Sequence, residues 1–164
     1  MGESDSENNI ERIVWDPKYE TGLPVIDAQH KSLVDLCNKF YQELMQHKVS
    51  GEPKLDDLLS RALKECVEYV KMHFRNEENL MTASGYKNFA AHKSQHDAFI
   101  KQILEISKKF PGAKVKFSFQ FIKFMEDWIL SHIAYEDQLF VKCVQDYYHR
   151  TQSDSLWNIE ELKN

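Results

Sequence analysis

The chain has 164 residues, of which 42% are hydrophobic and 12% aromatic, a composition that predicts one folded domain with a buried core and excludes wholesale disorder. Its formal net charge of −5, without any stretch dense in lysine and arginine, excludes the electrostatic footprint of a nucleic-acid-binding protein. No apolar run approaches the roughly 20 residues that a membrane-spanning helix needs, so we expect no membrane partner.

The chain opens with a polar segment that precedes the first helix. We expect residues 1–12 to form a flexible N-terminal segment, because they start acidic and polar and include no apolar signal region. The stretch up to Pro24 predicts an irregular arm anchored by Trp15. From about Val25 to Gln46, apolar residues recur at helical spacing and predict the first helix. Ser50-Gly51-Glu52-Pro53 then interrupts the pattern.

Three further helical runs follow in the chain. The second run extends from about Leu55 to Ala83 and stops at Ser84-Gly85, a plausible C-terminal cap. The third extends from about Asn88 to Lys109 and is ended by Pro111-Gly112. The fourth extends from about Lys116 to Tyr148.

Four amphipathic helices joined by short turns predict an all-α fold, an antiparallel up-down four-helix bundle with an irregular N-terminal arm. The bundle is expected to occupy residues 13–150, and no alternating strand pattern competes with it. Residues 151–164 are expected to form a C-terminal tail, in which Leu156, Trp157 and Ile159 could pack back on the bundle.

Five of the seven histidines lie on the apolar faces of the four predicted helices; they are His30, His73, His92, His96 and His132. His73 with Glu77, and His92 with His96, are each four residues apart, so the two side chains of a pair point the same way from their helix. Of the five, His30 lies on the first predicted helix and His132 on the fourth. Each helix therefore directs ligands toward the bundle axis, where helical bundles build metal sites.

A metal site explains this cluster better than ordinary packing does. A single histidine on an apolar face is more often a satisfied core residue than a ligand. Five together fail that explanation, because a bundle core offers few partners for so many ring nitrogens and leaving them without partners is costly. The ligands also outnumber those of a tetrahedral zinc site. The sequence therefore predicts two octahedral or near-octahedral ions bridged by carboxylates.

These motifs resemble the hemerythrin family, specifically its single-domain bacteriohemerythrins, over nearly all of residues 13–140. The matching residues are Trp15, Ile26-Asp27-Ala28-Gln29-His30, His73-Phe74-Arg75-Asn76-Glu77-Glu78, Gly85-Tyr86, His92-Lys93-Ser94-Gln95-His96 and Trp128-Ile129-Leu130-Ser131-His132-Ile133. The resemblance implies a non-haem di-iron centre, two Fe ions joined by an oxo or hydroxo bridge, that binds dioxygen reversibly.

The resemblance also implies a role for particular residues. Carried over motif by motif, one iron is bound by His92, His96 and His132, the other by His30 and His73, and Glu77 and Asp137 bridge the two. The iron with two histidines keeps an open position, where dioxygen would bind and take two electrons from the pair. The family's oxygen-pocket positions correspond to Leu33, Trp128, Ile129 and Ile133, apolar walls that exclude water and that can equally serve as core packing.

Helix geometry and the resemblance disagree at the second bridging carboxylate. An ideal helix pairs His132 with Glu136, four residues on, and turns Asp137 about 140° away. The family motif selects Asp137, and a local π-type widening of the helix would bring Asp137 closer to His132. We follow the family and expect Asp137 to be the bridge.

We expect an oxygen-binding protein, not an enzyme, that stores, delivers or buffers dioxygen. One alternative is an oxygen or redox sensor read by an unidentified protein partner, although no fused signalling domain is visible. Another is a di-iron enzyme acting on peroxide or nitric oxide, which the histidine-rich shell disfavours. Iron storage would need a cage that a small bundle does not supply. Manganese or zinc could also occupy these ligands.

The cysteines predict the compartment. Cys37, Cys66 and Cys143 are an odd number and form no CxxC pair, so a disulfide framework is not expected. They are typical of buried thiols in a reducing environment. Together with the polar N-terminus, this usage predicts a cytoplasmic protein.

Overall fold

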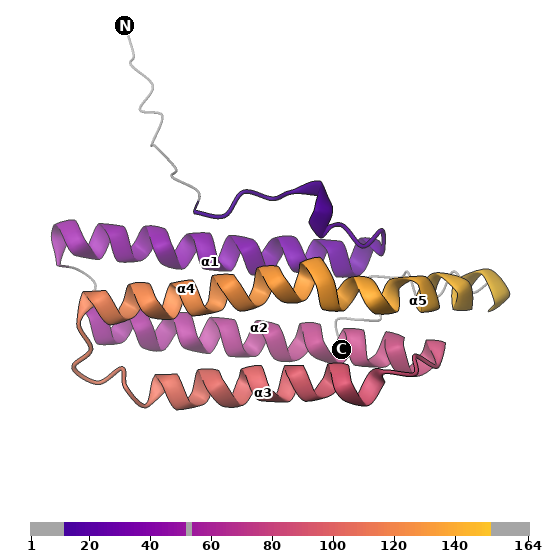
Figure 1. The fold of residues 1–164 in the computed structure, drawn as a ribbon. Helices are drawn as coiled ribbons and strands as arrows, with labels where there is room; N and C mark the ends of the chain where they lie inside the picture. The colour runs from indigo at the N-terminus through magenta and orange to yellow at the C-terminus, as the bar shows by residue number, and fades with distance from the viewer. Residues whose placement is uncertain (1–11, 52–53, 152–164) are drawn as a thin grey trace, which may run out of the picture.

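The computed structural model describes residues 12–51 and 54–151, and this part of the chain is helical, without a β-strand. The elements are η1 (Pro17–Tyr19), α1 (Pro24–Ser50), α2 (Leu55–Ser84), α3 (Phe89–Ser107), α4 (Val115–Ser131), η2 (His132–Glu136) and α5 (Asp137–Thr151). The long helices run side by side in alternating directions, and α5 continues the line of α4 (Figure 1). The predicted antiparallel four-helix bundle is confirmed.

Local sequence explains where the first two long helices begin and end. Pro24 stands in the first turn of α1, where its fixed φ fits and its missing N–H costs nothing. Gly51 follows α1 and Gly85 follows α2, both in the left-handed region at φ 76° and 72°, which glycine adopts without steric cost. The N–H of Tyr86 closes α2 on the carbonyl of Met81 at 2.9 Å. The predicted cap at Ser84-Gly85 is thus confirmed.

The fourth predicted helix is interrupted by one wide turn. Its helical run continues from α4 through η2 into α5, but η2 is a π-helix in which the N–H of Asp137 donates to the carbonyl of His132, five residues back. This turn holds one more residue than an α-helical turn. Its ends, His132 and Asp137, are both buried, at 3% and 0% exposure. The local π-type widening raised by the sequence is therefore present.

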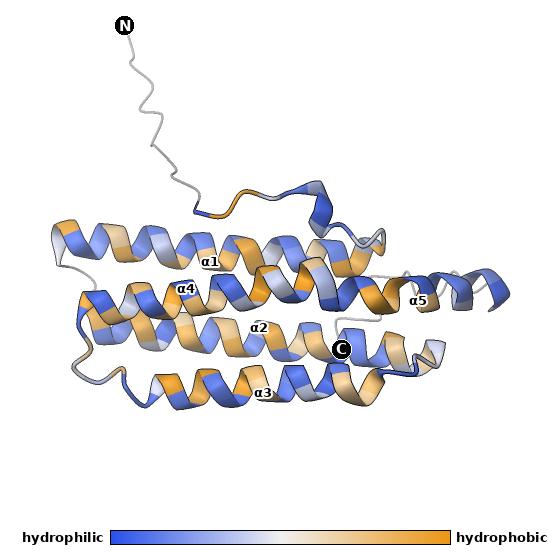
Figure 2. Ribbon diagram, in the orientation of Figure 1, coloured by the Kyte–Doolittle hydropathy of each residue, from blue (hydrophilic) through white to orange (hydrophobic). Residues whose placement is uncertain are grey.

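The core has two apolar clusters with a polar layer between them. On α1, Ile26 belongs to the smaller cluster and Leu33 to the larger, with His30 between. On α2, Phe74 belongs to the larger cluster and Leu80 to the smaller. Hydrophobic and hydrophilic residues intermix along every helix, as amphipathic packing requires (Figure 2). The buried histidine and carboxylate side chains of α1 and α2 therefore lie at one level of the bundle axis, between the two clusters.

The described residues include all three cysteines and all the long helices. The three cysteines are free; Cys37 and Cys66 are buried and Cys143 is half-buried. Burial raises the pKa of the Cys66 thiol to about 12, so this thiol is unreactive at neutral pH. None of the helices within residues 12–51 and 54–151 is long and apolar enough to cross a membrane.

One buried side chain fixes the N-terminal arm to α1. The Oδ1 atom of Asn38 accepts from the backbone N–H groups of Arg12 at 3.1 Å and Ile13 at 2.8 Å, and Nδ2 donates to the carbonyl of Ile13 at 2.9 Å. Ile13 and Tyr19 are buried, whereas Trp15, the predicted anchor, is half-buried. The arm is therefore held by Asn38 and two buried apolar residues as well as by Trp15.

Replacing Asn38 with alanine is expected to lower the free energy of unfolding by about 2–3 kcal/mol, because the buried N–H and carbonyl of Ile13 lose their partners. Urea unfolding measures the change. Asn88→Ala is the matched control, since Asn88 is exposed and its side chain makes no capping hydrogen bond. The control should stay within about 0.5 kcal/mol of the parent protein. Equal losses in the two variants would contradict the role given to Asn38.

Candidate metal centre

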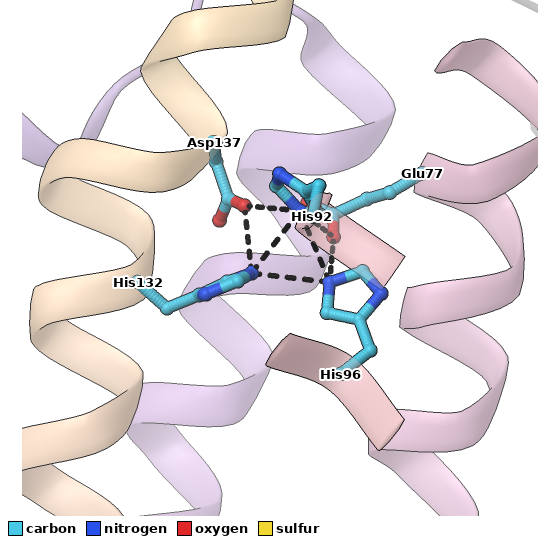
Figure 3. Close-up of side chains that lie close together, drawn as sticks. All are labelled: Glu77, His92, His96, His132 and Asp137. Atoms are coloured by element: carbon cyan, nitrogen blue, oxygen red, sulfur yellow. Dashed lines mark hydrogen bonds and ion pairs between the residues drawn. The ribbon is translucent and has the colours of Figure 1, made fainter. Parts of the chain in front are cut away.

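The structure brings the seven predicted ligands together in the polar layer. All four helical runs of the bundle contribute, where α4, η2 and α5 together make the fourth run. The ligands are His30 from α1, His73 and Glu77 from α2, His92 and His96 from α3, His132 from η2 and Asp137 from α5. Each is at most 3% exposed. Figure 3 shows five of them converging from three directions. The cluster is thus almost fully shielded from bulk water, although His96 also lines a groove between α2 and α3.

The donor atoms form two groups that share both carboxylates. One group contains Glu77, His92, His96, His132 and Asp137, and the other contains His30, His73, Glu77 and Asp137. Within each group the donor atoms lie within 4.8 Å of one another. We call these the three-histidine position and the two-histidine position. Every imidazole presents its Nε2 atom to the cluster.

Each carboxylate offers one oxygen to each position. Oε1 of Glu77 lies 3.4 Å from Nε2 of His73, while Oε2 lies 3.2 Å from Nε2 of His96. Oδ2 of Asp137 lies 3.1 Å from Nε2 of His30, while Oδ1 lies 3.1 Å from Nε2 of His132. This division of the oxygens is the arrangement that two carboxylates adopt when they bridge a pair of ions.

Several donor atoms of the cluster have no hydrogen-bond partner, and the others lie at distances that suit ligands of one ion. Both oxygens of Glu77, both oxygens of Asp137 and both nitrogens of His30 are buried without a hydrogen-bond partner. Buried charged atoms left in this state are costly unless a cation compensates them. At the other position, the Nε2 atoms of His92, His96 and His132 lie 3.1–3.2 Å apart. Neighbouring ligands at right angles, each about 2.1 Å from one ion, would be about 3.0 Å apart. The residues therefore fit two metal ions.

Burial and charge shift the pKa values of the cluster in opposite directions. Burial alone lowers the pKa of His30 and of His92, but the carboxylates of Asp137 and Glu77 outweigh it and raise both pKa values to about 9. Burial lowers the pKa of His73 to about 4. Burial raises the pKa of both carboxyls, but the surrounding imidazoles hold them well below their usual range. Protons on imidazoles thus balance the carboxylates when no metal does.

Loading the metal-free protein with Zn²⁺ at pH 7 is expected to release about two protons per chain, because His30 and His92 are protonated there and must lose a proton to bind a cation. Since both pKa values are raised, the release should be complete at pH 7 and should decline as the pH rises through about 9. A pH indicator in weak buffer measures the protons. Ca²⁺, which prefers oxygen ligands, is the control. Zinc uptake without proton release would contradict this balance.

Of the two neighbouring carboxylates, Asp137 lies in the cluster and Glu136 lies outside it. The η2 turn places Asp137 in the cluster, whereas Oε2 of Glu136 accepts from Nε2 of Gln95 at 2.9 Å, outside the two groups of donors. An ideal helix would have placed Glu136 beside His132. The wide turn is therefore the local feature that decides which carboxylate reaches the centre.

Of the four predicted oxygen-pocket residues, two line one cavity among the described residues and the other two do not line it. Leu33 and Ile129, each at most 3% exposed, line one narrow cavity with room of about 10 Å³ between α1, α2 and α4. Ile133 is buried at 1% exposure. Trp128 is half-buried, and its ring stacks on the His132 ring at 4.3 Å and on the Phe99 ring at 3.9 Å. Two of these residues thus border a cavity and one supports a predicted ligand directly.

Three residues around the centre were not singled out by sequence reasoning. The Phe74 ring stacks on the His96 ring, with centroids 3.8 Å apart and planes 2° from parallel. Gln29 Oε1 lies 3.0 Å from Nδ1 of His73, and Glu78 Oε1 lies 3.2 Å from Nδ1 of His96. The last two pairs are separated by 44 and 18 residues in the chain, so no local spacing could have revealed them.

The comparisons with known proteins agree with this geometry. The family described as the hemerythrin HHE cation binding domain matches residues 21–144. A bacteriohemerythrin of Methylococcus capsulatus is 30% identical over 127 residues, which cover 77% of this chain and 92% of the relative. A bacteriohemerythrin of Clostridium acetobutylicum is 31% identical over 130 residues, or 79% of this chain and 98% of the relative. A crystal structure of wild-type hemerythrin is 28% identical, with a TM-score of 0.65, and covers 81% of this chain and 98% of its own.

Proposed function

The chain belongs to the hemerythrin family, and from this premise we propose that it binds dioxygen reversibly at a di-iron centre in the buried polar layer. The observation that carries the proposal is the division of the oxygens of Glu77 and Asp137 between two groups of imidazoles. A single ion would not need two carboxylates that each face two ways. The bundle thus offers one site for two ions.

In this proposal the two ions differ in how many protein ligands they have. His92, His96 and His132 would hold one ion and His30 and His73 the other, with Glu77 and Asp137 offering oxygens to both. The bound iron pair supplies the two electrons that dioxygen accepts on binding and returns on release. The two-histidine position has one imidazole fewer, so an ion held there would keep a coordination site for dioxygen.

Apolar residues one helical turn from His30, of the two-histidine position, and from His132, of the three-histidine position, would keep water away from the centre. Leu33 follows His30 by one helical turn, and Ile129 precedes His132 by one turn, so both pack at the level of the larger apolar cluster. With Ile133 and Trp128 they form the proposed oxygen pocket. Because a dry pocket offers reduced oxygen no water to take protons from, we expect it to favour release of dioxygen over escape of superoxide or peroxide.

We propose binding, for storage, delivery or buffering of dioxygen, and not enzymatic turnover. The Phe74 ring packs against His73 of the two-histidine position and against His96, and the rings of Trp128 and Phe140 pack against His132 and His92. None of these rings supplies an acidic proton. An enzyme that reduces peroxide or nitric oxide needs such a donor near the reacting atoms. The environment of the centre therefore favours holding dioxygen over converting it.

Anaerobic reduction of the iron-loaded protein, followed by air, tests the function. Two irons per chain and a charge-transfer band that appears in air and disappears under vacuum are the expected result. The zinc-loaded protein is the control, since zinc has no redox chemistry and should give no band. Immediate and irreversible oxidation, with peroxide released or consumed, would instead favour a redox enzyme or a sensor.

A further inference from the structure

Two imidazoles of the centre have identified partners on their outer nitrogen, and these partners differ in charge. Because Nε2 of each ring faces the cluster, the outer Nδ1–H is free to donate. That of His73 points to the neutral amide oxygen of Gln29 at 3.0 Å, and that of His96 points to the carboxylate of Glu78 at 3.2 Å. His73 belongs to the two-histidine position and His96 to the three-histidine position. The two positions therefore have different surroundings.

Burial explains why each partner suits its place. Gln29 is 9% exposed, and its Nε2 donates to Sδ of Met72 at 3.5 Å, which directs Oε1 toward His73. A carboxylate there would be buried beside a thioether, without a cation to compensate it. The side chain of Glu78 is 21% exposed and lies 3.4 Å from Nζ of Lys93. It lines a groove of about 460 Å³ between α2 and α3, where water and a lysine can sustain its charge.

We propose that Glu78 and Gln29 make the two metal positions electronically unequal. A hydrogen bond from Nδ1–H to a carboxylate makes an imidazole a stronger donor through Nε2, and the charge-assisted bond is stronger than one to an amide. His96 therefore donates more electron density to its ion than His73 does, which favours the ferric over the ferrous state at the three-histidine position. In half-reduced protein the ferrous ion is then at the two-histidine position, the one proposed to bind dioxygen.

Glu78 is thus a positioning residue that acts on the metal through His96, and the inference rests on the proposed ligand assignment. The variant Glu78→Gln keeps the length of the side chain and an oxygen that can accept from His96, but removes the charge. We expect it to reduce the ferric preference of one iron by about tenfold, which raises that reduction potential by about 59 mV for one electron. Spectroelectrochemical titration of the iron-loaded protein measures the potential, and the iron content should remain two per chain.

Asp97→Asn is the matched control for overall charge. Asp97 lines the same groove and pairs with the same lysine, Lys93, at 3.0 Å. Its replacement therefore removes one negative charge from the groove without removing the charge that faces His96. The potentials of this variant should stay at the parent values. An equal shift in both variants would overturn the inference, because the effect would then be that of any nearby charge.

A second readout does not depend on iron. In the zinc-loaded protein, ¹⁵N-labelled histidine reports the hydrogen bond at each Nδ1–H by NMR. Glu78→Gln should move the Nδ1–H proton signal of His96 upfield and leave that of His73 in place. Unchanged potentials and an unchanged His96 signal, in a protein that still binds two ions, would overturn this inference alone. A parent protein that fails to bind two ions would overturn the proposed centre, and this inference with it.

Discussion

Replacing Asp137 with asparagine is expected to abolish the binding of two metal ions while leaving the helical bundle folded. Asn has the shape of Asp but not its charge, so helix α5 keeps its packing. In the parent protein Oδ2 faces His30 and Oδ1 faces His132, so one substitution weakens both positions. Loss of a partner outside the ligand shell already costs about 10–100-fold in metal affinity, and loss of a bridging ligand should cost more.

Metal content per chain after dialysis, together with helical content by circular dichroism, measures this effect. Glu136→Gln is the control, because it removes the same charge from the neighbouring position, where the side chain accepts from Gln95 and faces no histidine of the centre. That variant should hold two ions. The reverse outcome, metal lost with Glu136→Gln and kept with Asp137→Asn, would show that the wide turn does not place Asp137 between the ions.

Helix periodicity was sufficient for the bundle and for most of the cluster. The pairs His73 with Glu77, and His92 with His96, are four residues apart on helices whose apolar faces are clear, so their direction toward the axis follows from α-helical geometry. The predicted starts and ends of the helices differ from the observed ones by at most four residues, the largest difference being at the end of α1. Regular structure is predictable where each residue repeats the geometry of its neighbours.

Helix periodicity could not predict the features of the site and the fold that depend on irregular backbone or on contacts between residues distant in the sequence. The π turn at η2 has the composition of an ordinary helix, so only the resemblance to a family favoured Asp137 over Glu136. Gln29 and Glu78 look like exposed polar residues of an amphipathic helix until the helices are packed. The contacts that Asn38 makes with the arm are likewise set by tertiary structure, because the arm is irregular and precedes α1.

The position of the centre also explains its architecture. The polar layer lies between two apolar clusters, so each helix is fixed by packing both above and below its ligands. Ligands held on rigid elements keep their geometry when the ion changes charge. The unpartnered oxygens of Glu77 and Asp137 are tolerated because this packing, and not their own hydrogen bonds, fixes the backbone around them. The bundle thus stabilises a cluster that would be unfavourable in isolation.

Deleting the exposed residue Tyr135, before Asp137, is expected to leave the protein folded, whereas deleting the exposed residue Leu139, after Asp137, is expected to unfold it. Tyr135, which is 71% exposed, lies inside the π turn. Without it, the hydrogen bond from Asp137 N–H to the His132 carbonyl spans four residues, as in an ordinary α-helix. Asp137 and all of α5 then keep the faces they present to the bundle. We expect this variant to fold cooperatively and to retain metal.

Leu139 is a matched site, since it is 61% exposed but lies in regular α-helix. Its deletion turns every later residue of α5 by about 100° and takes the buried side chains of Phe140, Val144 and Tyr148 away from the core. Each buried side chain of this kind contributes about 1.5–3 kcal/mol, so their joint loss approaches the whole stability of a domain.

Thermal unfolding followed by circular dichroism, with metal content per chain, distinguishes the two deletions. The Leu139 deletion should unfold at a much lower temperature or fail to fold, while the Tyr135 deletion should stay close to the parent protein. The contrast follows from one property of the turn: it accommodates an extra residue without changing the register of the helix that follows. Equal damage from both deletions would mean that the width of the turn, and not only the placement of Asp137 and α5, is required by the fold.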